Sequence, residues 1–232
     1  MVCDHVPEEL SHVAGDYPDM FRALFAEEEV ELASYDVVNG ELPTHPRESE
    51  AWIITGSRYS VNDDLAWIRD LEEFTSRVPA ARVPLVGVCF GHQLIARALG
   101  GSVVRSKRGW GVGCMEVEVR SEASGPAWME PARDRYRILN SHADQVVSLP
   151  EGTRLLASTD HCPVSLMTVG DYLLGIQGHP EMDPSYLKAL VESRRGRSIP
   201  EETAARALES LKLGSDSTVV RDWMLNFMTQ ET

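Results

Sequence analysis

The chain has 232 residues, and its 22 Lys and Arg against 36 Asp and Glu give a formal net charge of −14 with His neutral. Its 43% hydrophobic and 25% charged residues are typical of a folded globular protein and exclude wholesale disorder. So large an acidic excess argues against non-specific binding of nucleic acid or of an anionic membrane surface, because both depend on Lys and Arg.

The first residues, Met1–His5, lack the basic start and the apolar core of a signal peptide, and no stretch approaches the roughly 18 apolar residues of a membrane helix. The few cysteines are Cys3, Cys89, Cys114 and Cys162. They are too far apart for a disulfide framework, so we expect a cytoplasmic protein. Only Met1–Cys3 could form an opening strand, so that strand is stunted or the natural start lies upstream.

In the N-terminal half, strands and helices are predicted to alternate. Short apolar runs predict strands, and apolar residues at helical spacing predict helices. In chain order, we expect strands at Val30–Val38 and Ala51–Thr55, a helix at Leu65–Val78, a strand at Val83–Val88 and a helix at Phe90–Leu99. This alternation is typical of a parallel sheet with helices on both faces.

The middle of the chain predicts short strands separated by turns, which indicates antiparallel additions to the sheet. The expected strands are Met115–Val119, Tyr136–Leu139, Gln145–Leu149, Arg154–Ser158, Ser165–Val169 and Tyr172–Gln177. Three helices are expected after them, at Pro184–Arg194, Glu201–Leu211 and Val219–Phe227. We therefore expect one domain over residues 1–232, with a C-terminal helical tail over 183–232.

The segment Gly87-Val88-Cys89-Phe90-Gly91 joins a predicted strand to a predicted helix. A nucleophile on such a sharp turn needs small residues two positions away on either side, and Gly87 and Gly91 are those residues. Cys89 would then stand at the N-terminus of the helix, where free N–H groups and the helix dipole stabilise a thiolate. The alternative interpretation is a buried, unreactive cysteine beside glycines that allow close helix packing.

A cysteine nucleophile needs a base, and the base needs a group that orients it. His179 follows an apolar strand at its carboxyl end, where open α/β sheets bind ligands, and Glu181 stands two residues later. Glu181 could accept a hydrogen bond from one ring nitrogen of His179 and leave the other nitrogen facing Cys89. Taken alone, His-Pro-Glu is more typical of a helix start; together with the turn at Cys89 it favours catalysis.

The sequence Gly-Val-Cys-Phe-Gly-His-Gln at 87–93, followed by His-Pro-Glu at 179–181, resembles the class I glutamine amidotransferases over nearly the whole chain. The closer resemblance is to the freestanding guanylate-synthetase-like branch, which includes γ-glutamyl peptidases. The resemblance implies an α/β fold with a flavodoxin-like open, mostly parallel sheet, helices on both faces and antiparallel additions. It also implies a catalytic triad of Cys89, His179 and Glu181.

The resemblance assigns further positions around this triad. The backbone N–H groups of Gly56 and Phe90 would face the oxyanion. The implied substrate contacts are Ser57, Gln93, Ser141, His142 and Asp144. A plain turn and helix cap is the alternative for His142 and Asp144. Gly178 departs from the family, in which an aromatic residue is common at that position.

These residues suggest acyl transfer without a metal or another cofactor. Cys89 would attack a γ-glutamyl amide and form a γ-glutamyl thioester, while His179 protonates the leaving ammonia or amine and then activates water. We expect a freestanding hydrolase of glutamine or of a γ-glutamyl amine or peptide. One alternative is a glutaminase subunit that delivers ammonia to a separate synthetase or ligase partner. The other is an inactive binding or regulatory protein on the same fold.

Overall fold

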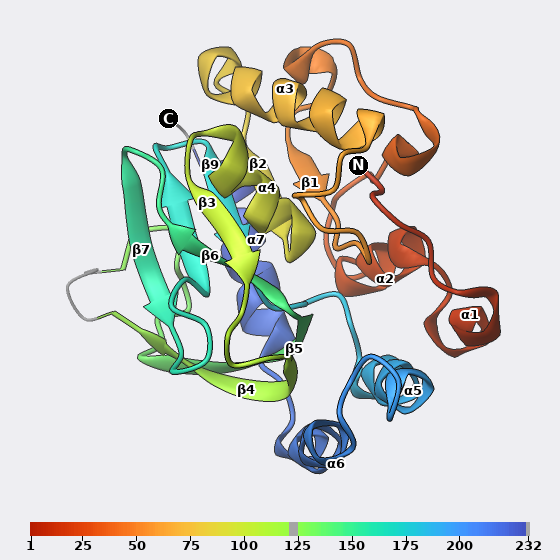
Figure 1. The fold of residues 1–232 in the computed structure, drawn as a ribbon. Coiled ribbons are helices and arrows are strands. Elements are labelled where there is room, and N and C mark those ends of the chain that lie inside the picture. Colours follow the sequence, from red (N-terminus) through yellow and green to blue (C-terminus); the bar gives the residue numbers. More distant parts are fainter. Residues whose placement is uncertain (121–124, 231–232) are drawn as a thin grey trace.

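The computed structural model of the protein describes residues 1–120 and 125–230. Within these residues, the main sheet has the strand order β1-β2-β9-β8-β7-β4-β5 (Figure 1). Its strands are β1 (Trp52–Ile54), β2 (Leu85–Val88), β4 (Gly111–Val119), β5 (Arg135–His142), β7 (Thr153–Ser158), β8 (Leu166–Val169) and β9 (Leu173–Ile176). A small second sheet pairs β3 (Ser102–Arg105) with β6 (Asp144–Ser148).

Helices cover both faces of the main sheet (Figure 1). They are α1 (Glu8–Ala14), α2 (Tyr17–Leu24), α3 (Ala66–Ala81), α4 (Phe90–Ala98), α5 (Pro184–Arg194), α6 (Glu201–Ser210) and α7 (Ser217–Thr229). Short 3-10 turns occur at Val37–Asn39, Pro46–Glu48 and Leu211–Leu213. None of the helices in the described ranges combines the length and the apolar character needed to cross a bilayer.

Parallel pairing holds the part of the sheet that carries the predicted nucleophile. β2 lies between β1 and β9 and is parallel to both. The β9–β8, β8–β7, β7–β4 and β4–β5 pairs are all antiparallel. The predicted α/β fold with antiparallel additions is therefore confirmed. Because β1, β2 and β9 run the same way, the residues that follow them meet at one edge.

Apolar side chains on the two faces of the sheet form separate clusters. α3 and α4 pack on one face, where Phe74 and Leu94 are fully buried. α7 packs on the other, where Trp223 and Phe227 contact the side of the sheet that carries Val86 and Val88. A third cluster lies between α1, α2, α5 and α6. The C-terminal helices predicted as a tail are thus part of the packed core.

The predicted strand Val30–Val38 is wrong. Only Asp36 forms a bridge, with Val2, and the chain turns into a 3-10 helix directly afterwards. The residues before Asp36 are mostly exposed, and backbone hydrogen bonds join Tyr35 and Val38 to Val2 in the short Met1–Cys3 stretch. A strand forms only where a neighbouring strand satisfies its N–H and C=O groups, and Met1–Cys3 is too short to do so.

Candidate active site

Cys89 lies at a strained turn between β2 and α4. Its φ of 52° and ψ of −97° place it outside the regions that most L-residues adopt. Its N–H donates to the carbonyl of Ile176 on β9 at 2.8 Å, which fixes the turn on the neighbouring strand. A Cβ on Gly87 would lie 2.4 Å from the backbone of Gly91, so the turn requires glycine.

The side chains of His179 and Glu181 form a buried hydrogen-bonded pair. Nδ1 of His179 lies 2.7 Å from Oε1 of Glu181. The His179 N–H donates to the carbonyl of Leu139 on β5 at 2.8 Å, which fixes the backbone that carries the ring. Burial opposes the charged imidazolium, but the charges of Glu181 and Cys89 and hydrogen bonds to both raise the pKa of His179. The structure thus brings together the three residues of the predicted triad.

Gly56 lies against both the predicted nucleophile and the predicted base. A Cβ built on Gly56 would be 2.9 Å from Cε1 of His179 and 3.7 Å from Cβ of Cys89. Within the described residues, neither the Gly56 N–H nor the Phe90 N–H donates a hydrogen bond outside its own helix or strand. Two free donors beside a cysteine side chain are the arrangement that an oxyanion hole needs.

Three of the predicted substrate contacts meet at one backbone carbonyl. The amide Nε2 of Gln93 donates to the Asp144 carbonyl at 2.8 Å, and Nδ1 of His142 lies 3.0 Å from the same oxygen. The Asp144 carboxylate accepts a hydrogen bond from Ser60 at 2.7 Å. These contacts fix the start of β6, and both the turn alternative and a direct substrate contact stay predictions.

The other two predicted contacts have different surroundings. Ser57 donates its hydroxyl to the carbonyl of Cys3 at 2.9 Å, so that donor is already used. Ser141 Oγ is buried and has no hydrogen-bond partner in the part of the chain that the structure describes. Because its buried hydroxyl lacks a partner, Ser141 is a better candidate for a substrate contact than Ser57, whose hydroxyl is already hydrogen-bonded.

His161, which is not among the predicted substrate contacts, packs on His142. The two rings meet edge to face with centroids 5.9 Å apart. A Cβ on Gly111 would lie 2.6 Å from Nε2 of His142 and 2.9 Å from Cδ2 of His161, so glycine is required there. Burial lowers the pKa of His142 to about 3, which keeps this ring neutral at physiological pH. No sequence spacing links these positions, since they come from different strands and loops.

The position of Gly178 has a steric explanation. A Cβ there would lie 2.6 Å from Cγ2 of Ile138 on β5. An aromatic side chain at residue 178 would therefore collide with the neighbouring strand, and Ile138 fills that volume instead. The glycine beside the base thus leaves room for the Ile138 side chain of β5.

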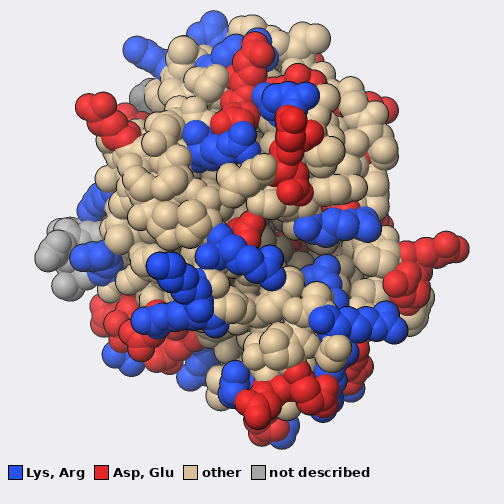
Figure 2. All heavy atoms as spheres, in the orientation of Figure 1, with Lys and Arg blue, Asp and Glu red and all other residues tan. Residues whose placement is uncertain are grey.

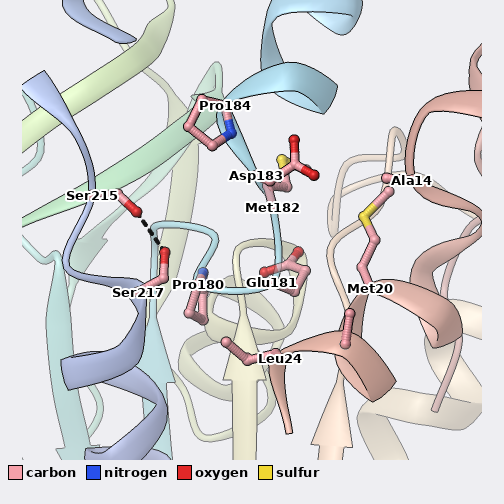
Figure 3. Close-up of a pocket in the computed structure, with 11 residues that line it drawn as sticks. Ala14, Met20, Leu24, Pro180, Glu181, Met182, Asp183, Pro184, Ser215 and Ser217 are labelled. Carbon is pink, nitrogen blue, oxygen red and sulfur yellow. Dashed lines mark hydrogen bonds between the residues drawn. The ribbon is translucent and has the colours of Figure 1, made fainter. Parts of the chain in front are cut away.

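A cavity of about 400 Å³ lies beside the segment that carries Glu181 (Figure 3). Met20 and Leu24 of α2 line one side, and Ser215 and Ser217 before and in α7 line the other. The Glu181 side chain has no exposed surface, so the cavity does not open onto its carboxylate. Cys89 and His179 are not among the lining residues, whereas Pro180, Glu181 and Met182 are, so the cavity adjoins the segment that follows the predicted base.

The net charge of −14 does not describe every part of the surface. Figure 2 shows Lys and Arg side chains spread over one face of the molecule, with several of them in its middle part and acidic side chains among them. Local cations of this kind attract anionic molecules even to an acidic protein. The acidic composition is therefore compatible with an anionic small-molecule substrate.

Comparison with known proteins points to one family. A family model described as "Glutamine amidotransferase class-I" matches residues 29–193. The chain is 33% identical to gamma-glutamyl peptidase 4 of Arabidopsis thaliana over 182 residues, 77% of this chain and 72% of that protein. It is 30% identical to a glutamine-hydrolyzing GMP synthase subunit of Sulfurisphaera tokodaii over 137 residues, 59% of this chain and 69% of that one.

A solved glutamine amidotransferase from Thermotoga maritima has the same fold. The two superimpose with a TM-score of 0.75 at 20% sequence identity, and the matched region covers 99% of this chain and 97% of the Thermotoga chain. At this identity the likeness concerns the fold alone, whereas the family model covers well over half of the sequence. The chain belongs to the class I glutamine amidotransferase family.

Proposed function

We propose that the protein hydrolyses a γ-glutamyl amide bond through a γ-glutamyl thioester on Cys89. The observation that carries this proposal is the position of Gly56. A Cβ built on this residue would lie 2.9 Å from Cε1 of His179 and 3.7 Å from Cβ of Cys89. This closeness of the Gly56 loop to a cysteine and a histidine supports acyl transfer, which needs a nucleophile, a base and an oxyanion donor near one another.

In this mechanism, Cys89 attacks the δ-carbonyl carbon of the γ-glutamyl group, and the C–N bond breaks as His179 protonates the leaving nitrogen. The Gly56 and Phe90 N–H groups stabilise the negative oxygen of the tetrahedral intermediate. His179 then removes a proton from water, which attacks the thioester and releases glutamate. Glu181 holds the imidazole ring and stabilises its positive charge.

Relatives named for two activities suggest two roles for the same chemistry. The match to a gamma-glutamyl peptidase supports a freestanding hydrolase of γ-glutamyl amines or peptides. The match to a GMP synthase subunit supports the second candidate, a glutaminase that delivers ammonia to a separate synthetase. Residues 1–232 contain neither a Ser-Gly-Gly-x-Asp-Ser loop nor a Gly-x-x-x-x-Gly-Lys-[Ser/Thr] loop, so in this second candidate the synthetase active site lies outside these residues.

The test measures glutamate release by the purified chain from glutamine and from a panel of γ-glutamyl amides and dipeptides, with Cys89→Ala as the control. Turnover of γ-glutamyl amides without a partner supports the hydrolase. Negligible turnover of every substrate until a synthetase is added supports the ammonia donor instead. Equal rates for wild type and Cys89→Ala would exclude the thioester mechanism altogether.

A further inference from the structure

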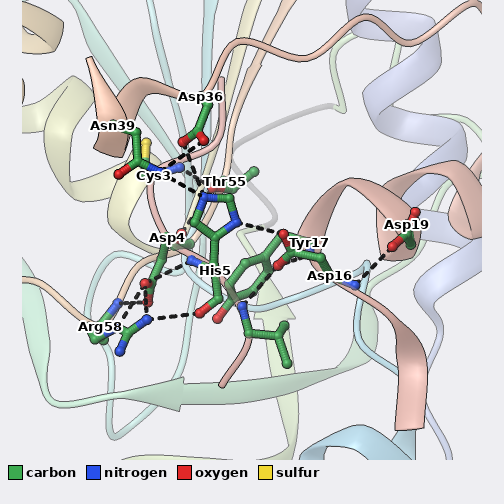
Figure 4. Close-up of polar contacts among 12 residues, drawn as sticks. Cys3, Asp4, His5, Asp16, Tyr17, Asp19, Asp36, Asn39, Thr55 and Arg58 are labelled. Carbon is green, nitrogen blue, oxygen red and sulfur yellow. Dashed lines mark hydrogen bonds and ion pairs between the residues drawn. The ribbon is translucent and has the colours of Figure 1, made fainter. Parts of the chain in front are cut away.

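The loop that carries Gly56 is attached to the N-terminal segment through each of its neighbouring residues. The Thr55 hydroxyl accepts a hydrogen bond from the Cys3 N–H at 3.0 Å. The Ser57 hydroxyl donates to the carbonyl of Cys3 at 2.9 Å. One residue further along the chain, the Arg58 side chain donates to the carboxylate of Asp4 (Figure 4). The loop and the segment are about fifty residues apart in the sequence, so these contacts belong to the folded state alone.

The contact between Asp4 and Arg58 is the strongest of these attachments. Both Nε and Nη2 of Arg58 reach Oδ1 of Asp4, at 2.7 Å and 2.6 Å. The backbone N–H of Arg58 donates to the second carboxylate oxygen at 2.8 Å. Asp4 is 4% exposed, so its charge is removed from water and depends on these donors. Charge-assisted bonds of this kind fix geometry better than neutral ones do.

The N-terminal segment is itself held from the other side. The ring of His5 lies between two carboxylates, with Nδ1 2.6 Å from Asp16 and Nε2 3.2 Å from Asp36. Asp16 is also the N-cap of α2 and accepts the N–H of Val6 at 2.9 Å. The segment therefore links the Gly56 loop to α2 and to the turn at Asp36 through a continuous set of polar contacts (Figure 4).

We propose that Asp4 and Arg58 are positioning residues for the candidate oxyanion hole, an inference that rests on the proposed function. Both residues act by fixing the backbone on which the Gly56 N–H stands. A shift of about 1 Å in such a donor can lower a rate about 100-fold, because the donor must meet the oxyanion at hydrogen-bonding distance.

The test compares Asp4→Asn, Arg58→Gln and Arg58→Lys with wild type. Arg221→Gln, in a partly buried ion pair with Glu28, is the matched control. For each variant, kcat and KM are measured on the best γ-glutamyl substrate, together with the rate of Cys89 alkylation by iodoacetamide and the melting temperature. Alkylation needs the thiolate and access to it, but it forms no oxyanion, so it separates a displaced donor from a damaged nucleophile.

We expect Asp4→Asn and Arg58→Gln to lower kcat about 10- to 100-fold with KM within about threefold and alkylation unchanged. Arg58→Lys retains the charge and restores part of kcat, while Arg221→Gln keeps the wild-type values. If Asp4→Asn fails to fold, the Arg58 variants decide, because the Arg58 side chain is 51% exposed.

Two results would overturn the inference while leaving the proposed function intact. One is a folded Asp4→Asn or Arg58→Gln protein whose kcat stays within about twofold of wild type, and the other is an alkylation rate that falls in parallel with kcat in these variants. Absence of any Cys89-dependent glutamate release by the wild-type protein would instead remove the proposed function and, with it, the role of the oxyanion loop.

Discussion

The Nδ1 atom of His179 lies 2.7 Å from Oε1 of Glu181, and the Glu181 side chain has no exposed surface. A carboxylate so enclosed has its strongest favourable interaction with the imidazolium form of the ring. The pair therefore favours proton uptake on His179 beside Cys89, and removing the Glu181 charge should have a large effect.

Glu181→Gln should lower kcat at least about 100-fold, because the amide neither stabilises the imidazolium nor fixes the same ring tautomer. The same substitution should lower the pKa of His179, which the Glu181 charge raises despite burial. Glu192→Gln, on the exposed side of α5, is the control and should leave kcat unchanged. Steady-state kinetics from pH 5 to 9 would check both points, and an unchanged pH profile in Glu181→Gln would contradict the assignment.

Gly56→Ala should abolish most activity without unfolding the protein. Its new Cβ would lie 2.9 Å from Cε1 of His179, which displaces either the ring or the loop that carries the free N–H. A decrease in kcat of at least about 10-fold is expected. Gly125→Ala, where the nearest side-chain atom is 3.7 Å away, is the steric control. Wild-type kcat in Gly56→Ala would show that this loop does not approach the reacting atoms.

Gly87→Ala should destabilise the fold by about 2–3 kcal/mol or more, because its Cβ would overlap the backbone of Gly91 at 2.4 Å. Backbone atoms at the start of α4 cannot move without changing the turn at Cys89. Urea unfolding followed by circular dichroism measures the free energy of unfolding. A loss below about 1 kcal/mol would mean that the turn is more adaptable than its geometry indicates.

Cys89 should be the cysteine that iodoacetamide modifies first in the native protein. Burial raises the pKa of the Cys3 thiol to about 12 and that of Cys162 to about 11, so both stay protonated. The thiol of Cys114 donates to the carbonyl of Gly214 at 3.1 Å, and burial raises its pKa as well. Peptide mapping after brief alkylation should find the label at Cys89, and Cys162→Ser should be labelled as wild type is. First labelling elsewhere would contradict an activated Cys89.

His5→Gln should destabilise the protein at pH 6 but have little effect at pH 9. The hydrogen bond to Asp16 raises the pKa of His5 above 6.5, so the bridge contributes stability below pH 6.5 and loses it as pH rises through the higher folded value. Because the His5 side chain is 41% exposed, the contribution at pH 6 is at most about 1 kcal/mol. Urea unfolding of both proteins at both pH values checks this, and an equal loss at pH 9 would point to packing instead.

Much of the fold could be predicted because its buried elements are apolar and regular. β2, β9, α4 and α5 lie where apolar runs and helical spacing placed them. α1 and α2 were not predicted, although the Asp16 and Asp19 capping box with Pro18 signals the start of α2. That residues 1–232 form one domain remains a prediction.

The candidate site could likewise be predicted only in part. Cys89, His179 and Glu181 could be located because each follows a strand with a recognisable local sequence, and their roles stay predictions. The partners of Ser57 could not be anticipated, since Cys3 lies 54 residues earlier. The contact between Asp4 and Arg58 is equally remote in sequence, and no periodicity encodes it.

The parallel pairing of β2 with β9 has a consequence for synthesis of the chain. Val88 and Ile176 are partners in this pair, so the turn at Cys89 is braced by a strand that the ribosome makes almost ninety residues later. Until β9 emerges, β2 has an open edge and Cys89 has no base beside it. A nascent chain should thus be incapable of hydrolysis and exposed to aggregation, and translation pauses before β9 should lower the yield of folded protein.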